Sequence, residues 1–357
     1  MCAMSRASDE SDDGADERAP GRPGGIHRAP LALVGLLTLV VGIGGGAGVY
    51  FAGEEATDSV NRIEIAPEVL AANDGPAENY LIVGSDSRAG LDVDATGAED
   101  AAEVTGSRSD SIMILRRDPE FGASLLSIPR DLWVPIAGDD RDGKINSAFN
   151  GSASQLAQTI TQFLGIPINH YIEIDFDGFS RLVDTFGGID ICLDNAGQDL
   201  STGLSIPGGC QTLAGPQALA FVRSRHYEEW IESEGNWVPD NQNDLGRIAR
   251  QQMFLRAAAA DGLEAVNDNP FLLGNMLDAT QELVSFDQDL DLIDAADSLR
   301  AAFSEGLRTF QLPVTELIVE DQSALELVDG ADVILAYFAG TGPMPPEPPT
   351  ETNASDD

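Results

Sequence analysis

Short apolar runs alternate with longer amphipathic segments through the middle of the chain, from about residue 79 to residue 340. The runs are rich in Ile, Val and Leu and are bounded by Gly, Pro, Asn or Asp, a pattern typical of strands. It predicts strands at 79–84, 111–117, 123–129, 170–175 and 188–194, with later ones at 309–314 and 315–321. The segment DPEFG at 118–122 separates the second and third strands and predicts a β-hairpin.

The amphipathic segments have apolar residues at helical spacing and often stop at glycine. They predict helices at 152–165, 176–188, 215–225, 244–263, 271–283, 290–304 and 331–339. Asp244 is a natural N-cap for the fourth of these helices. Strands alternating with helices, together with one hairpin, predict an α/β layered domain with a mixed sheet.

An uncharged segment precedes the folded part. Residues 31–51 are long enough to cross a bilayer as one helix. Arg18, Arg22 and Arg28 precede the segment, so we expect a single-pass protein of the cell membrane with a cytoplasmic N-terminus and an extracytoplasmic main domain. A cleaved signal peptide is the alternative, although the leader is long and no A-x-A site follows the apolar run.

The remaining boundaries follow from composition. Residues 1–30 are acidic and rich in Pro and Gly, which predicts a disordered cytoplasmic leader. Residues 53–77 predict a polar stalk, residues 79–340 the folded domain, and residues 341–357 an acidic, proline-rich tail.

Two cysteines lie in the part expected outside the membrane. Cys192 and Cys210 are 18 residues apart, and an oxidising compartment allows them to form a disulfide. Two buried free thiols are the alternative.

The net charge of the chain limits the kinds of partner that it can bind. The formal net charge is −40, with 20 basic residues against 60 acidic ones. Such a chain lacks the broad basic face that nucleic acid requires, so we expect no nucleic-acid partner. Eight of the basic residues, including Lys144, the only lysine, fall in five short motifs. Positive charge kept together in an acidic chain predicts a pocket for a specific anion, and phosphate is the natural candidate.

Several candidate residues follow strand ends. Asp86 and Asp110 flank neighbouring predicted strands and could hold a divalent cation such as Mg²⁺, although an aspartate there is commonly a turn or cap residue. Arg130 follows a strand and stands beside Asp131. The pair is either a local ion pair or an arginine fork for phosphate oriented by the aspartate.

Further arginines lie on predicted helices. Arg223 and Arg225 are at a helix end, while Arg247, Arg250 and Gln251 share one helix face. A solvated helix face is the alternative reading. Guanidinium groups that share a cleft repel one another, so they need a multivalent anion such as pyrophosphate.

Taken in order, these motifs resemble the LytR-CpsA-Psr family of cell-envelope proteins. They are GSDSR (84–88), RSDS (108–111), SIPRDL (127–132), KINSAF (144–149), the run 165–193, VRSRH (222–226) and DLGRIARQQ (244–252). The resemblance implies a three-layer α/β/α fold preceded by a single transmembrane helix. It also implies a phosphotransferase that moves a glycopolymer from a polyprenyl-pyrophosphate carrier to a peptidoglycan hydroxyl, forming a phosphodiester link.

The resemblance also implies roles for single residues. Mg²⁺ would be held by Asp86 and Asp110. Pyrophosphate contacts are implied for Arg88, Arg108, Arg130, Arg223, Arg225, Arg247 and Arg250, with Gln251 nearby. An aspartate must deprotonate or position the acceptor hydroxyl, and Asp131 and Asp110 are both candidates. Arg130, Asp131 and Asp110 are therefore the expected catalytic residues.

Two other functions remain open at this stage. Water could replace the sugar hydroxyl, which would make the protein a polyprenyl-pyrophosphate hydrolase. A non-catalytic envelope regulatory or binding protein is the other alternative. The stretch between His226 and Asp244 is longer than in compact members and carries two tryptophans that either contact a sugar chain or pack; we favour packing. The polymer, the lipid and the oligomeric state are not predicted.

Overall fold

The computed structural model describes residues 60–85, 109–150, 152–185, 187–268, 283–304 and 306–346. The predicted leader and membrane anchor lie outside these ranges, as do most of the tail and of the predicted helix 271–283. Within the described ranges, no helix combines the length and apolar character that crossing a membrane requires.

A mixed sheet of seven strands forms the centre of the fold. In spatial order the strands are β1 (Asn61–Ile63), β14 (Val284–Asp287), β7 (His170–Asp175), β2 (Glu78–Ser85), β3 (Ser109–Asp118), β4 (Gly122–Ile128) and β15 (Leu307–Gln311). The pairs β1–β14, β7–β2 and β4–β15 are parallel and the other three are antiparallel. The predicted mixed sheet and its β3–β4 hairpin are confirmed.

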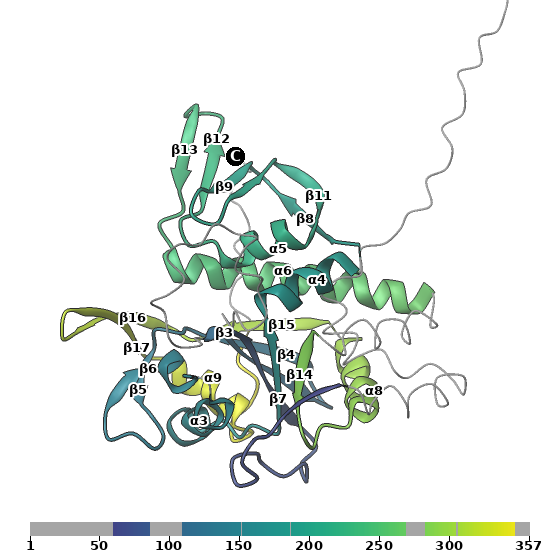
Figure 1. Cartoon of the computed structure of the whole chain (residues 1–357), viewed down its shortest axis with the longest axis vertical. Coiled ribbons are helices and arrows are strands. Elements are labelled where there is room, and N and C mark those ends of the chain that lie inside the picture. The colour runs from purple at the N-terminus through teal and green to yellow at the C-terminus, as the bar shows by residue number, and fades with distance from the viewer. Residues whose placement is uncertain are drawn as a thin grey trace, which may run out of the picture.

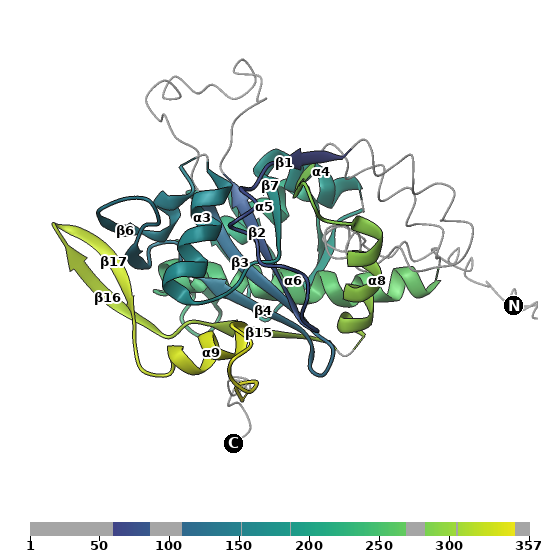
Figure 2. The ribbon, with the colours of Figure 1, turned by 90° about the horizontal axis from the view of Figure 1, so that it is seen from below.

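Both faces of this sheet are covered, because the middle of each central strand carries a buried apolar run and successive side chains point to opposite faces. Tyr80 and Ile82 belong to one core cluster, while Leu81 and Val83 belong to a second cluster. The sheet therefore forms the middle of three layers (Figures 1 and 2).

One set of helices covers the Tyr80 face. It comprises α4 (Phe176–Thr185), α5 (Gly215–Arg223), α6 (Asn243–Asp268) and α8 (Leu292–Phe303). The opposite face carries α3 (Ala153–Thr159), which continues as one π-helical turn η2 (Ile160–Leu164), together with η1 (Ile145–Ala148) and α9 (Ala331–Phe338). The predicted helix 152–165 thus changes its hydrogen-bonding pattern midway and ends, as expected, at Gly165, which has a φ of 72°.

Four small sheets lie outside the central one. They are β8 (Ile189–Leu193) with β11 (Gly209–Leu213), β9 (Gly197–Asp199) with β10 (Leu204–Ile206), β12 (Glu228–Ile231) and β13 (Asn236–Pro239), β5 (Trp133–Pro135) with β6 (Asp142–Lys144), and β16 (Val314–Val319) with β17 (Gln322–Leu327). Cys192 and Cys210 stand directly opposite each other in the β8–β11 pair and form the predicted disulfide.

Two predictions differ from the structure in position. The segment 188–194 is a strand, β8, but it pairs with β11 outside the central sheet because Gly187 and Gly188 turn the chain away. Residues 60–77, which composition assigned to a stalk, supply the edge strand β1 and bury Ile65 and Val69 in the core. The folded part therefore begins before Asn79.

Candidate active site

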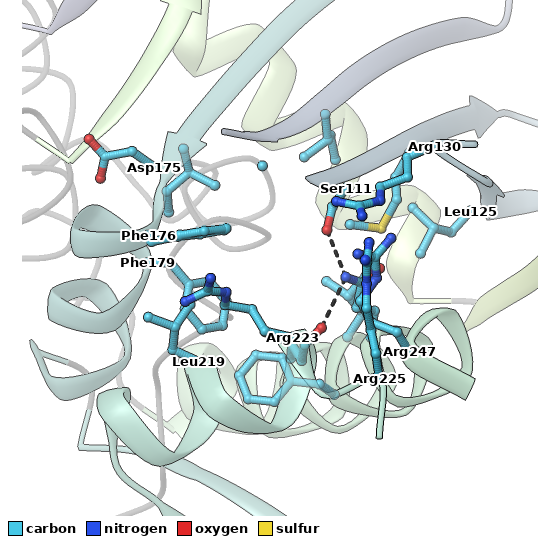
Figure 3. Close-up of a pocket in the computed structure, with 18 of the residues that line it drawn as sticks. Ser111, Leu125, Arg130, Asp175, Phe176, Phe179, Leu219, Arg223, Arg225 and Arg247 are labelled. Carbon is cyan, nitrogen blue, oxygen red and sulfur yellow. Dashed lines mark hydrogen bonds between the residues drawn. The ribbon is translucent and has the colours of Figure 1, made fainter. Parts of the chain in front are cut away.

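A cavity of about 290 Å³ lies between the central sheet and the layer of α4, α5 and α6. Figure 3 shows its walls. Most of the lining is apolar: Ile82, Met113, Leu115, Leu125, Ile172, Ile174, Phe176, Phe179, Leu219, Val222, Phe254, Leu255 and Leu307. The strand residues in this wall come from the inward face of β2, β3, β4, β7 and β15. Such a cavity suits a hydrocarbon chain.

Four arginines line the same cavity: Arg130, Arg223, Arg225 and Arg247. Arg130 follows β4, Arg223 ends α5, Arg225 lies two residues further, and Arg247 is on the first turns of α6. The fold thus gathers charges that are more than 100 residues apart in the sequence. Figure 3 shows Arg130, Arg225 and Arg247 on one side of the cavity and Arg223 on the other.

Asp244 joins three of these arginines. Its Oδ1 lies 2.8 Å from Nη2 of Arg247, 3.3 Å from Nη2 of Arg225 and 4.0 Å from Nε of Arg130. Its side chain is 15% exposed. The sequence predicted this residue only as a helix cap, yet in the structure it belongs to the first turn of α6, beside the cavity. Its place two residues before GRIAR, in the motif DLGRIARQQ, was the signal available for a role in the site.

Arg130 also lies next to a second ion pair, between Asp131 and Lys144. Asp131 Oδ2 lies 3.8 Å from Nε of Arg130, and its Oδ1 lies 2.9 Å from Nζ of Lys144. Leu325 of β17 donates its backbone N–H to the carbonyl of Asp131 at 2.9 Å. The ion pair with Lys144 and the hydrogen bond from Leu325 together fix the loop that carries Arg130 and Asp131. Neither Asp131 nor Lys144 lines the cavity.

The ion pairs link cations from separate segments of the chain. The carboxylate of Asp131 lies between Arg130 and Lys144, and the carboxylate of Asp244 lies within 4.0 Å of Arg130, Arg225 and Arg247. A diester of pyrophosphate carries about two negative charges, one on each phosphate, and would complete this cluster.

Arg223 is held differently. Its guanidinium lies 4.1 Å from the centroid of the Phe176 ring, an arrangement that orients the cation at the cavity wall. Its side chain is exposed.

Arg250 and Gln251 occupy different places although both were predicted at the pyrophosphate. Arg250 is buried, with Nη1 2.7 Å from Asp240 and Nη2 donating to the carbonyl of Ser224 at 2.7 Å, and it stacks on Tyr227. It is not among the cavity-lining residues. Gln251 does line the cavity and donates to Ser111 Oγ at 2.7 Å.

Asp199, which sequence reasoning missed, fixes the segment that carries Arg225. Its carboxylate is fully buried and accepts hydrogen bonds from Ser201, Ser224 and the backbone N–H groups of Arg225 and His226. Burial by itself would raise the pKa of Asp199, but the hydrogen bonds from Ser201 and Ser224 lower it well below the usual range. Asp199 is the last residue of the short strand β9 and belongs to none of the motifs, so nothing in the sequence indicated this role.

The ends of the central strands β2 and β3 next to the cavity contain a β-bulge. Gly84 pairs with Ser111 and Ser85 pairs with Ser109, so Asp110 is left without a partner in the register. Gly84 and Ser111 both line the cavity. Bulges re-aim side chains beside functional sites. Asp86, Arg88 and Arg108 lie outside the described residues.

Oxygen groups lie at these strand ends. The hydroxyl of Ser109 is buried without a hydrogen-bond partner among the described residues. Burial raises the pKa of Glu173 on β7, against a hydrogen bond from Tyr171 that lowers it, but Glu173 lies on the sheet face opposite to the cavity-lining Ile172 and Ile174. The described ranges hold no cluster of three or more Asp, Glu, His or Cys residues that could bind a metal ion. The donors available here are hard oxygen atoms, which fit Mg²⁺ rather than a soft metal.

The sequence profile of the LytR_cpsA_psr family matches residues 49–332, which is most of the chain. The chain belongs to the LytR_cpsA_psr family. The resemblance inferred from the motifs is therefore confirmed, and described residues of SIPRDL, VRSRH and DLGRIARQQ line the cavity.

Two curated relatives are similar to this family member. The probable cell wall biosynthesis protein LcpB of Corynebacterium glutamicum is 35% identical over 204 residues, which are 57% of this chain and 46% of the relative. The polyisoprenyl-teichoic acid–peptidoglycan teichoic acid transferase TagU of Bacillus mycoides is 33% identical over 190 residues, 53% of this chain and 57% of the relative. The chain thus spans about half the length of the curated relatives it matches.

Solved structures share the fold. A LytR-Csp2A-Psr enzyme from Actinomyces oris has a TM-score of 0.62 at 23% identity, over 78% of this chain and 96% of that one. TagT bound to LI-WTA has a TM-score of 0.57 at 20% identity, over 78% and 100%. The predicted α/β architecture with a mixed central sheet agrees with both.

Proposed function

We propose that this protein is a phosphotransferase that moves a glycopolymer from a polyprenyl-pyrophosphate carrier to a hydroxyl group of peptidoglycan. One observation carries the proposal: an apolar cavity is lined at one end by Arg130, Arg225 and Arg247, whose guanidinium groups can bind a pyrophosphate. A hydrocarbon chain and a pyrophosphate joined in one molecule fit both parts. The family and the name of the TagU relative support the same reaction.

In this proposal the lipid chain lies among the apolar side chains and the pyrophosphate contacts Arg130, Arg225 and Arg247, with Arg223 at the opposite wall. The acceptor hydroxyl oxygen attacks the phosphorus next to the sugar. The bond from that phosphorus to the bridging oxygen breaks, and lipid monophosphate leaves. A phosphodiester between glycopolymer and peptidoglycan remains. The arginines stabilise the negative charge that develops on the transferred phosphate.

The hydroxyl proton must pass to a base. Asp110 and Asp131 are the proposed candidates. Asp131 is already paired with Lys144 at 2.9 Å, whereas Asp110 follows Ser109 in the bulge beside the cavity.

We further propose that Asp86 and Asp110 hold Mg²⁺. The bulge that leaves Asp110 outside the strand register and the buried Ser109 hydroxyl beside it support the assignment. When bound, the ion would neutralise charge on the phosphate oxygens. The same proposal places the catalytic domain outside the membrane, held by residues 31–51.

The test combines lipid analysis with transfer assays. Mass spectrometry of the purified protein should detect a bound polyprenyl phosphate or pyrophosphate. Incubation of a lipid-pyrophosphate glycan with peptidoglycan should give a phosphodiester-linked product, and the variants Arg130→Ala, Arg225→Ala and Asp110→Ala should lose that product.

Arg181→Ala is the matched control, because Arg181 is an exposed arginine of α4 that pairs with Asp177 in the same helix and does not line the cavity. Full transfer by the three site variants would contradict the proposal. Release of free glycan phosphate in place of a linked product would identify a hydrolase.

A further inference from the structure

The hairpin β12–β13 begins at the mouth of the cavity. Arg225 and His226 line the cavity, and β12 starts two residues later. The backbone N–H of Asp240 closes the base of the hairpin by donating to the carbonyl of Tyr227 at 3.0 Å. Asp244 follows four residues after this closure. Both ends of the hairpin are therefore attached to the arginine cluster, and Figure 1 shows β12 and β13 rising away from the central sheet.

One face of the hairpin is fixed against the protein. Tyr227 is buried and packs directly on Gly197 of β9, where any added Cβ would meet the phenol ring at 2.1–2.6 Å. Leu204 and Ile206 of the same small sheet are buried in the main core. Since side chains alternate along a strand, Trp230 and Trp237 belong to the other face.

The two tryptophans stand directly opposite each other in the hairpin register. Their ring centroids are 5.6 Å apart in an edge-to-face arrangement, and both side chains are half-buried. Trp230 Nε1 donates to Glu232 at 2.9 Å. On the same face, Gln198 Nε2 donates to Glu228 Oε2 at 2.7 Å. We call Trp230, Trp237, Gln198 and Glu228 the tryptophan face.

Its charge distinguishes this face from the arginine cluster. Residues 228–240 contain five acidic residues and no basic one. Phosphate is therefore repelled from the hairpin and attracted to the arginines below it. Aromatic faces that accept the C–H groups of a sugar ring, next to an amide and a carboxylate that accept hydroxyl donors, fit an uncharged saccharide.

We infer that the tryptophan face is a binding subsite for the saccharide of the lipid-linked donor. The inference rests on the proposed function. The donor saccharide is assigned to this face because that saccharide is covalently joined to the phosphate proposed to bind at Arg225. Trp230 lies five residues after Arg225, so the extended chain places it within about 17 Å of that residue, a distance that the first sugars of the donor can span.

The experiment compares two ligands that differ only in the saccharide. One is farnesyl pyrophosphate capped as its methyl diester, so that both ligands carry two negative charges, and the other carries an uncharged chitobiose unit in place of the methyl group. Wild-type protein should bind the second ligand more tightly. Trp230→Ala combined with Trp237→Ala should abolish this preference, lowering affinity for the chitobiose ligand roughly tenfold and leaving farnesyl pyrophosphate binding unchanged.

Ile231→Ala is the control, since Ile231 lies on the same strand but on the opposite face; it should keep the preference. Circular dichroism and thermal unfolding would verify that the variants fold. A role in packing alone would leave the preference intact, and that result overturns the inference. Loss of affinity confined to soluble peptidoglycan strands would also overturn it. Failure of wild-type protein to bind either pyrophosphate would instead refute the proposed function, and with it this subsite.

Discussion

The carboxylate of Asp244 allows a sharp test of the charge balance at the cavity mouth. Replacing it by asparagine keeps the shape of the side chain and removes its charge. Three guanidinium groups would then face one another without the anion that now lies 2.8, 3.3 and 4.0 Å from them. We expect Asp244→Asn to lower the free energy of unfolding and to make the protein more dependent on a bound anion.

The magnitude follows from burial. Removing one partner of a fully buried ion pair costs about 3–5 kcal/mol. The Asp244 side chain is 15% exposed and that of Arg225 is 31% exposed, so solvent screens part of the interaction and we expect about 2 kcal/mol. For a chain of this size the loss corresponds to a decrease of roughly 4 °C in Tm.

The assay is thermal unfolding with and without inorganic pyrophosphate. Pyrophosphate should raise the Tm of Asp244→Asn by more than it raises the Tm of the wild type, because the added anion replaces the lost carboxylate. Asp240→Asn is the matched control: Asp240 is also 15% exposed, but its partner Arg250 lies outside the cavity lining. Equal rescue of both variants, or no loss of stability in Asp244→Asn, would refute the reasoning.

Three further predictions test other parts of the structure. Cys192→Ser combined with Cys210→Ser should lower the free energy of unfolding by about 3 kcal/mol, the loop-closure value for an 18-residue separation, in denaturant titrations; unchanged stability in non-reducing buffer would contradict the disulfide's role. Since the pKa of Asp199 is lowered in the folded state, its stabilising contribution is present above the unfolded value near 4 and lost as pH falls toward the folded pKa. Unfolding measured between about pH 5 and pH 2 should therefore be less pH-dependent in Asp199→Asn than in the wild type. Leu219→Trp should fill part of the apolar cavity, so that mass spectrometry finds less co-purifying lipid while the Tm changes little; undiminished lipid would argue against the cavity as its site.

The sequence predicted the main parts of the fold because they depend on local patterns. The strands β2, β3 and β4 each contain an apolar run with buried residues on both faces of the sheet, and β7 buries Tyr171, Ile172 and Ile174. The helix α6 and the disulfide between Cys192 and Cys210 were also predicted from local sequence. The segment of β1 was not, since three residues with no apolar pattern become a strand only by pairing with β14.

Motifs and scarcity of positive charge together predicted which arginines matter, and the structure brings Arg130, Arg225 and Arg247 to one end of one cavity. Sequence could not separate Arg247 from Arg250. They lie three residues apart on α6 and both are buried, but Asp240 and the carbonyl of Ser224 bind the Arg250 guanidinium outside the cavity lining, while Arg247 lines the cavity. The roles of Asp244 and Asp199 likewise depend on partners from distant segments, and such contacts exist only once the tertiary structure has formed.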